Sequence, residues 1–259
     1  MDRATELRLL ARQMHKQPDD LGYLDSLDGE ALHRLRSALQ NRLLDEFAPT
    51  FEKMASGGKI APDKLSAFLC KKVFGPTLTA NMSYFTPPEK AAKMCRHFDT
   101  EFMAEVSRET IPERAEAMLK GLPVELMVPT TRALLENGDY HIMGGFTDYM
   151  PEDKINVLMR EIQDPADNLR ISSYAQRKDR IAAIATGFDD DTLTALIRAG
   201  HMKDEFVLEL ALTCAEMPAE QQQRMARLTD AINPEYRGKS RVLAEQAGLL
   251  DRMQAFFDA

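Results

Sequence analysis

The residues of this chain that could do chemistry are most concentrated between residues 139 and 149. The candidate site residues there are Asp139, Tyr140, His141, Gly144, Gly145, Asp148 and Tyr149. An imidazole titrates near neutral pH, and paired glycines let a ligand or another chain approach the backbone. The pattern is therefore typical of a polar, aromatic-lined recess for a ligand or partner. The alternative is structural: the glycines allow two helices to pack closely, while the aromatic side chains cap and cover a core.

Other patterns with a chemical meaning are weaker. The glycine pair lacks the Lys-Ser/Thr of a phosphate-binding loop. The run Asp-Asp-Asp-Thr at 189–192 could be pictured as a magnesium site, but acidic residues before an apolar stripe are typical of a helix N-cap and first turn. The five histidines show no HxxxH or HExxH spacing, and no GxSxG motif is present. We therefore expect no catalytic residue, no metal ligand and no cofactor, with a metal site assembled from distant residues left open.

Two smaller groups are predicted to be structural. Cys70, Cys95 and Cys214 are odd in number, far apart and in apolar surroundings, which favours reduced thiols in the core. The basic group at residues 177–180 could meet an acidic partner, but charges at a helix start are usually solvated.

The elements that must position these residues repeat along the chain. The segment 86–94 recurs as 110–118, an offset of 24 residues, and each copy opens with proline followed by glutamate. The backbone N–H groups in the first turn of a helix have no acceptor within the helix, so proline, which lacks this group, is tolerated there. A carboxylate is stabilised by the positive end of the helix dipole. The pattern therefore predicts helix starts. Weaker copies begin at Pro62, Pro151 and Pro218.

Apolar stripes with helical spacing follow these starts. Four such stripes, each predicted to be a buried face, are formed by Leu65, Phe68, Leu69 and Val73, by Ala115, Met118, Leu119 and Leu122, by Ile155, Leu158, Met159 and Ile162, and by Ile181, Ile184, Ala185 and Phe188. A 24-residue unit holds two helices of about ten residues, which are marginal alone and must stack on their neighbours. We predict an all-α fold, a right-handed armadillo-like superhelix of short stacked helix pairs. The candidate recess lies where the spacing of helix starts stretches from 24 to 39 residues.

Three regions are predicted from the changes in pattern. Residues 1–54 form an N-terminal helical cap with a stripe of Leu32, Leu35, Leu39 and Leu43, and residues 59–233 form the repeat superhelix. The Ala-Ser-Gly-Gly-Lys run at 55–59 is the expected hinge. Residues 234–259 form a C-terminal amphipathic helix or cap, whose Met253, Phe256 and Phe257 either close the stack or pair two chains into a homodimer.

The Ile-Pro-Glu-Arg-Ala opening at 111–115 and the Leu-Pro joint at 122–123 resemble the cytosolic N-domain of MgtE-type magnesium transporters. The resemblance covers about residues 60 to 232 and implies an armadillo-like helical fold. The membrane helices of that family are missing, so transport is not implied. In that family carboxylates of the acidic N-domain take part in magnesium sensing, but no residue here matches a ligand motif.

Net charge and the lengths of apolar runs limit the classes of partner that we expect. A net charge of -8 at pH 7 would repel a polyphosphate backbone, so we expect no nucleic-acid binding. No apolar run is long enough to span a membrane, and the first residues do not resemble a signal peptide, so we expect a cytoplasmic protein with no membrane span.

These observations leave three hypotheses for function. The first is a non-catalytic scaffold or regulator, of the kind found in uncharacterised bacterial helical-repeat proteins, that holds a protein partner on the superhelix surface. The second is a sensor that responds to a small molecule or to a divalent metal such as magnesium. The third, an unrecognised hydrolase, is remote, and we expect that the protein is not an enzyme.

Overall fold

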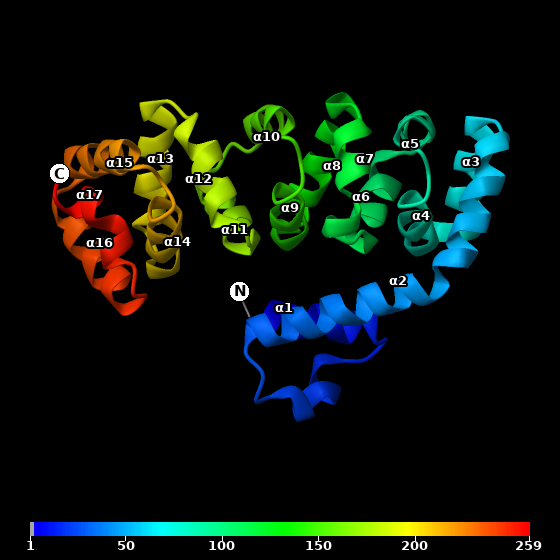
Figure 1. Cartoon of the computed structure of the whole chain (residues 1–259), viewed down its shortest axis with the longest axis horizontal. Helices are drawn as coiled ribbons and strands as arrows, with labels where there is room; N and C mark the ends of the chain where they lie inside the picture. The colour runs from blue at the N-terminus through cyan, green and yellow to red at the C-terminus, as the bar shows by residue number, and fades with distance from the viewer. Residues whose placement is uncertain (1–2) are drawn as a thin grey trace. The chain divides into compact units, whose positions relative to one another are not determined.

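The chain is helical throughout the part that the structure describes (Figure 1). This computed structural model describes residues 3–259, apart from the side chains of residues 58–60, and no strand occurs among them. The all-α prediction is thereby confirmed. The chain divides into two compact units, Met1–Leu122 (unit 1) and Pro123–Ala259 (unit 2).

Unit 1 contains one long helix and several short ones. Its α-helices are α1 (Arg3–Gln13), α2 (Gly29–Ile60), α3 (Asp63–Leu69), α4 (Gly75–Ser83), α5 (Pro88–Cys95), α6 (Thr100–Glu109) and α7 (Glu116–Gly121). Two 3-10 helices, η1 (Pro18–Leu24) and η3 (Pro112–Arg114), and a π-helix, η2 (Cys70–Phe74), connect them.

The start of unit 1 is held together by a small core and a buried charge. Leu10, Leu21 and Leu32 are fully buried where α1 and η1 pack on α2. Beside them Glu6 accepts a hydrogen bond from the Arg36 guanidinium at 2.8 Å. Burial opposes ionisation of Glu6, but the bonds from His33 and Arg36 outweigh it and lower the pKa of the carboxyl. The pair therefore fixes α1 to α2.

Helix α2 differs from the sequence-based expectation in two ways. It continues through residues 55–57, so the expected hinge is helical there, and its first part buries Leu32 while Leu39 and Leu43 are exposed. The leucine stripe therefore covers a core only over its first turns. The division at residues 54 and 233 stays a prediction.

Unit 2 is a series of short helices. They are α8 (Val124–Glu136), α9 (Tyr140–Thr147), α10 (Glu152–Leu158), α11 (Pro165–Tyr174), α12 (Lys178–Thr186), α13 (Asp190–Gly200), α14 (Asp204–Cys214), α15 (Ala219–Ile232), α16 (Glu235–Gln246) and α17 (Gln254–Phe257), with 3-10 turns η4 (Met159–Glu161) and η5 (Leu250–Met253). Helix α11 packs on α9, α13 and α14, and α14 also packs on α16.

The proline-based helix starts are largely confirmed. Pro88 is the first residue of α5, and Pro62, Pro151 and Pro218 are the N-caps of α3, α10 and α15. Pro112 differs, because it opens the 3-10 helix η3 and the α-helix that follows begins only at Glu116. The stretched spacing before Pro151 is explained by an additional helix, α9.

The C-terminal end of the chain packs into unit 2. Met253 and Phe256 are buried in a core that also contains residues of α12 to α16. Arg237 donates hydrogen bonds to the carbonyl oxygens of Phe256 and Phe257 at 2.8 and 2.9 Å. These apolar side chains are used within the chain, whereas pairing of two chains through this end stays a prediction.

A buried histidine joins the end of α13 to α16. The ring of His201 stacks on Tyr236 with centroids 4.0 Å apart, and its Nδ1 and Nε2 atoms lie 2.9 Å from the Ile197 carbonyl oxygen and 3.3 Å from Ser240 Oγ. Burial lowers the pKa of His201 below its ordinary value of 6.5, and the nearby Lys239, which pairs with Asp204, lowers it further.

Unit 2 is expected to lose stability on mild acidification. Between the pKa of folded His201 and 6.5, the unfolded chain binds a proton that the folded chain does not, so the free energy of unfolding falls as pH falls through this window. Urea unfolding of wild type and His201→Gln at several pH values should show a smaller slope in the variant. The exposed His97→Gln is the matched control, and an equal slope in wild type and His201→Gln would contradict the assignment.

Candidate functional site

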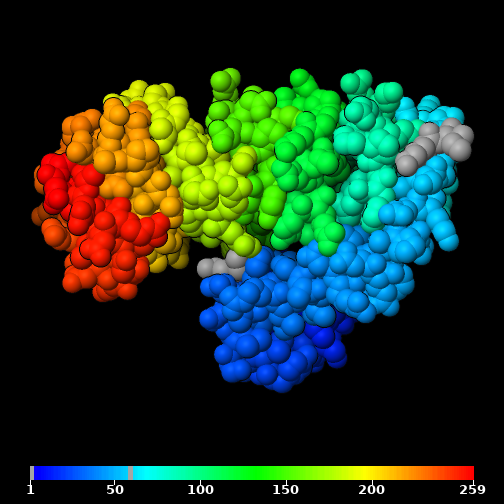
Figure 2. Space-filling model, in the orientation of Figure 1, coloured from blue at the N-terminus to red at the C-terminus, as the bar shows by residue number. Residues whose placement is uncertain are grey.

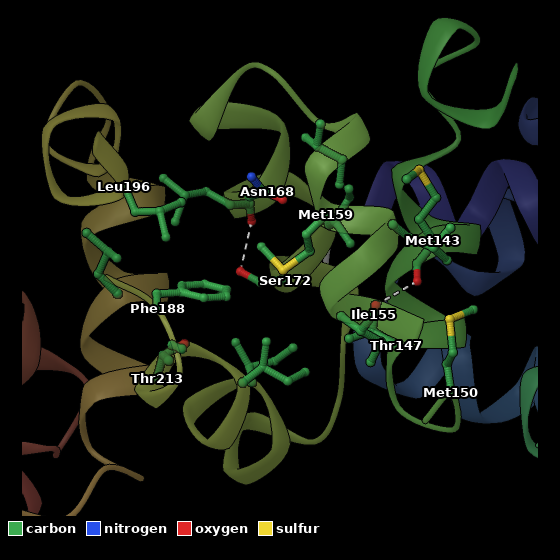
Figure 3. Close-up of a pocket in the computed structure, with 18 of the residues that line it drawn as sticks. Met143, Thr147, Met150, Ile155, Met159, Asn168, Ser172, Phe188, Leu196 and Thr213 are labelled. Carbon is green, nitrogen blue, oxygen red and sulfur yellow. Dashed lines mark hydrogen bonds between the residues drawn. The ribbon is translucent and has the colours of Figure 1, made fainter. Parts of the chain in front are cut away.

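An apolar cavity that is partly open to solvent lies in unit 2 (Figure 3). It has a volume of about 150 Å³ and is lined by residues of every helix from α8 to α15. The lining residues are Thr131, Leu134, Met143, Phe146, Thr147, Met150, Ile155, Leu158, Met159, Ile162, Asn168, Leu169, Ile171, Ser172, Ile181, Ile184, Ala185, Phe188, Leu193, Leu196, Leu210, Thr213, Met217 and Met225. None of these side chains is charged.

The cavity is made from the buried faces of successive helices. Two of the four apolar stripes predicted from the sequence, 155–162 and 181–188, face it with all their members. The stripe predicted at 65–73 is wrong as a buried face, because Leu65, Phe68 and Val73 are exposed. In Figure 3 Phe188 and Leu196 lie on one side of the cavity, Met143 and Met150 lie on the other, and Met159 lies between them. The spacing of apolar residues therefore identified the faces that line the cavity.

Three polar side chains of the lining have no hydrogen-bond partner among the described residues. They are the hydroxyls of Thr131 and Thr213, both on buried residues, and the carboxamide of half-buried Asn168. By contrast, Ser172 Oγ donates to the Leu169 carbonyl oxygen at 3.2 Å and Thr147 Oγ1 to the Met143 carbonyl oxygen at 3.0 Å (Figure 3). The polar atoms of these three side chains are not fully buried, so they remain accessible as hydrogen-bonding groups of the cavity wall.

A buried ion pair supports the wall of the cavity at Ser172. The Nζ of Lys178, at the start of α12, lies 2.7 and 2.9 Å from the carboxylate oxygens of Glu209 on α14. Ser172 Oγ on α11 lies 2.9 Å from Glu209 Oε1, so its single hydroxyl proton is shared between this carboxylate and the Leu169 carbonyl oxygen. Three helices that line the cavity are therefore tied together by one carboxylate.

The other basic residues near Lys178 also have partners within the chain. Arg180 donates from Nε to the Thr147 carbonyl oxygen at 2.8 Å and from Nη2 to the Met150 carbonyl oxygen, and Arg177 pairs with Asp179 at 3.1 Å. Arg180 thus holds the end of α9 against α12. Only part of the group is solvated, as the exposed Arg177 shows.

The residues predicted to form a recess lie on and beside α9, and none of the seven lines the cavity. Tyr140 donates from its hydroxyl to Asp167 at 2.9 Å, and its ring lies under the Arg170 guanidinium. The His141 ring meets the edge of Tyr174 at 6.1 Å between centroids. These contacts all join α9 to α11.

Asp148 and Gly144 also serve this junction. Asp148 is buried and accepts hydrogen bonds from the backbone N–H groups of Gln176 and Arg177 at 2.9 and 3.1 Å, while burial raises the pKa of its carboxyl. Gly144 lies against the backbone of α11, and Gly145 is half-buried in α9. The remaining two, Asp139 and half-buried Tyr149, lie just before and just after α9.

Two further expectations concern metal and thiol chemistry. Asp189 caps α13 by accepting from the Thr192 N–H at 2.8 Å, as the helix-start pattern predicted. No group of three or more metal-ligating side chains occurs among the described residues. Cys70 and Cys214 are buried, and burial raises the pKa of the Cys95 and Cys214 thiols to about 12.

Sequence reasoning missed Thr131, Asn168 and Thr213. Thr131 and Thr213 stand within mainly apolar helical sequences, at positions where a buried face is expected, and this is the signal that could have drawn attention to them. Comparison with known proteins does not assign the site: no family model, curated protein or solved structure matches the chain.

The Gly144 contact generates a stability prediction. A Cβ added at Gly144 would lie 2.5 Å from the Ile171 carbonyl oxygen and 2.7 Å from Tyr174 Cβ, too close for either to yield freely. Gly144→Ala should lower the free energy of unfolding by about 1–3 kcal/mol. Denaturant unfolding measures the change, with Gly238→Ala on α16, where a Cβ meets nothing within 4 Å, as control. Equal effects of the two substitutions would show that close packing does not require Gly144.

The buried ion pair between Lys178 and Glu209 generates a second stability prediction. Lys178→Met should cost about 3–5 kcal/mol of unfolding free energy, because it leaves a buried Glu209 carboxylate without its countercharge. The double variant Lys178→Met/Glu209→Gln should lose less than the single one. Lys203→Met, which removes an exposed pair with Glu205, should cost under about 1 kcal/mol. A double variant at least as unstable as Lys178→Met would contradict this account.

Proposed function

We propose that unit 2 binds a small, uncharged, largely apolar molecule in its cavity. The observation that carries the proposal is a lining without charged side chains that nevertheless includes three polar groups with no partner among the described residues. An apolar ligand is favoured because burying it releases its surface from water, and a single polar atom on it could accept from Thr131, Asn168 or Thr213.

The volume limits the size of this molecule. Drug-sized ligands occupy pockets of roughly 300–1,000 Å³, whereas an apolar cavity of about 150 Å³ stays dry and accepts a molecule of the size of benzene. The cavity in unit 2 has a volume of the second kind, although it is partly open to solvent. We therefore propose a ligand with one ring or a short chain, bearing one hydrogen-bond acceptor such as a carbonyl oxygen.

The proposed role is binding, not catalysis. General acid–base chemistry requires a titratable group at the reacting atoms, and the lining includes none. The role corresponds to the small-molecule sensor among the hypotheses from the sequence, with an apolar ligand in place of a metal. Binding of such a molecule would stabilise unit 2 and so couple its concentration to the stability of the fold.

A scaffold role in protein interaction is the second candidate. Leu39, Leu43 and Phe47 are exposed at four-residue intervals along α2, so they form an apolar face of the kind that pairs with a partner helix. We also propose that the helices stack as a right-handed armadillo-like superhelix resembling the MgtE N-domain, in a cytoplasmic bacterial protein. The packing of short helices on their neighbours supports this arrangement.

The cavity proposal is tested with two small probes, toluene and cyclohexanone. At a concentration 100 times its Kd, a probe should add about 2.7 kcal/mol to the stability of unit 2 and raise its Tm by roughly 5–10 °C. Ala185→Leu, which fills the cavity, should abolish both shifts. Ala183→Leu, on the exposed face of the same helix, should leave them unchanged.

Two outcomes would contradict the proposal. One is the absence of any shift with either probe in the wild-type protein. The other is an Ala185→Leu variant whose Tm rises with the probe as much as that of Ala183→Leu. Such a result would show that the probe binds outside the cavity, because filling the cavity would then leave its binding unchanged.

A further inference from the structure

Unit 1 presents an apolar surface on α3 and the π-helix η2. Leu65, Phe68 and Val73 are 49%, 56% and 65% exposed. Hydrogen bonds in a π-helix run from residue i to i+5, so Val73 lies about one turn beyond Phe68. In Figure 2 the cyan atoms of this region lie at the surface. Three large apolar side chains in one short stretch are thus left in water.

Cationic side chains are interleaved with this surface. Lys64 and Lys72 are exposed beside Leu65 and Val73. Lys71 lies within the same stretch and pairs with Asp99. Residues 64–75 contain no carboxylate. The stretch therefore combines exposed apolar and positively charged groups.

The neighbouring helix adds to the positive charge. Helix α5 packs on α3, and its Lys93 is exposed, as are Arg96 and His97 just after it. Lys93 and His97 are close enough to the start of α3 to lower the pKa of Asp63, although Lys90, which pairs with Asp63 at 2.5 Å, has the larger effect. Basic groups at the end of α5 and just after it therefore lie near the start of α3.

The concentration of positive charge here is opposite to that of the chain as a whole. Residues 63–99, which include the partners of Lys90 and Lys71, carry six Lys and Arg against three Asp and Glu, while the other residues carry 27 Lys and Arg against 38 Asp and Glu. A positive field that is confined to one surface of an acidic protein acts only within about 10 Å at ordinary salt, so it orients that surface towards a negative partner.

We propose that the surface formed by Leu65, Phe68, Val73, Lys64 and Lys72 docks on an anionic lipid bilayer. Leucine, phenylalanine and valine enter the boundary between headgroups and acyl chains, while the lysines remain with the negative headgroups. Nucleic acid fits less well, because aliphatic Leu65 and Val73 offer no face on which a base would stack. The docking surface belongs to unit 1 and does not depend on the cavity of unit 2.

Flotation of the full chain with lipid vesicles tests the proposal. The protein should float with vesicles of phosphatidylcholine and phosphatidylserine, and much less with phosphatidylcholine alone. Added salt should weaken the binding, because it screens the attraction of the lysines.

Paired variants assign the binding to this surface. Lys64→Gln/Lys72→Gln should weaken partitioning about 30-fold, since each lysine near an anionic surface contributes roughly fivefold. Lys16→Gln/Lys120→Gln removes the same charge from exposed positions elsewhere in unit 1 and should change partitioning little. Leu65→Ser/Phe68→Ser should weaken binding at least tenfold. Leu39→Ser/Leu43→Ser, on the exposed face of α2, is its control.

Three results would overturn the proposal. The first is failure of the wild-type chain to float with anionic vesicles. The second is an equal loss in test and control variants, which would place the contact elsewhere. The third is binding of an RNA oligonucleotide or of polyglutamate that the lysine variant abolishes while vesicles are not bound, which would identify an acidic macromolecule as the partner.

Discussion

Most of this fold follows from the shortness of its helices. Apart from α2, with 32 residues, the α-helices of the described residues span four to 14 residues. Helices below roughly 12–15 residues are marginal in water even with favourable composition, so their stability must come from burying one face against neighbours. Each helix of unit 2 therefore depends on the next, and the shared core of α12 to α17 is the result.

The dependence of short helices on their neighbours also explains where charged side chains are buried in the two units. A buried carboxylate is stabilised by a countercharge or by several hydrogen bonds, and two of the three buried carboxylates of the described residues have a countercharge on another helix, while Asp148 accepts from two backbone N–H groups. Glu6 in unit 1 is held by Arg36 and His33, and Glu209 in unit 2 is held by Lys178 and Ser172. Each network specifies which helices meet, a restriction that apolar contacts alone do not impose.

Several features were predictable from local sequence because their causes are local. Proline followed by an acidic residue identified the starts of α3, α5, α10 and α15, and Asp189 was correctly predicted to cap α13. The helical course of residues 55–57 was not, because two glycines lower helix propensity without preventing a helix. The exposure of Leu39 and Leu43 depends on which helices reach that part of α2, and no local pattern records it.

The candidate site also combines features that local sequence predicts with features that depend on tertiary packing. Periodicity predicted that the stripes at 155–162 and 181–188 face inward, and they do. The same spacing at 65–73 predicted a buried face that the structure does not have. Whether such faces fill the space between them depends on the shapes of side chains from eight helices, so the cavity itself could not be predicted. The recess between residues 139 and 149 stays a prediction, and the partners of its side chains, such as Asp167 for Tyr140, lie outside the segment and could not be read from it.

The make-up of the cavity wall has a consequence for the breadth of recognition. Five of its side chains are methionines: Met143, Met150, Met159, Met217 and Met225. Methionine is unbranched, flexible and polarisable, so it adapts to irregular shapes at little cost. A wall of this kind discriminates poorly between molecules of similar volume and different outline. Selectivity would then reside in the few directional contacts to Thr131, Asn168 and Thr213, and chemically related compounds would compete for one binding site.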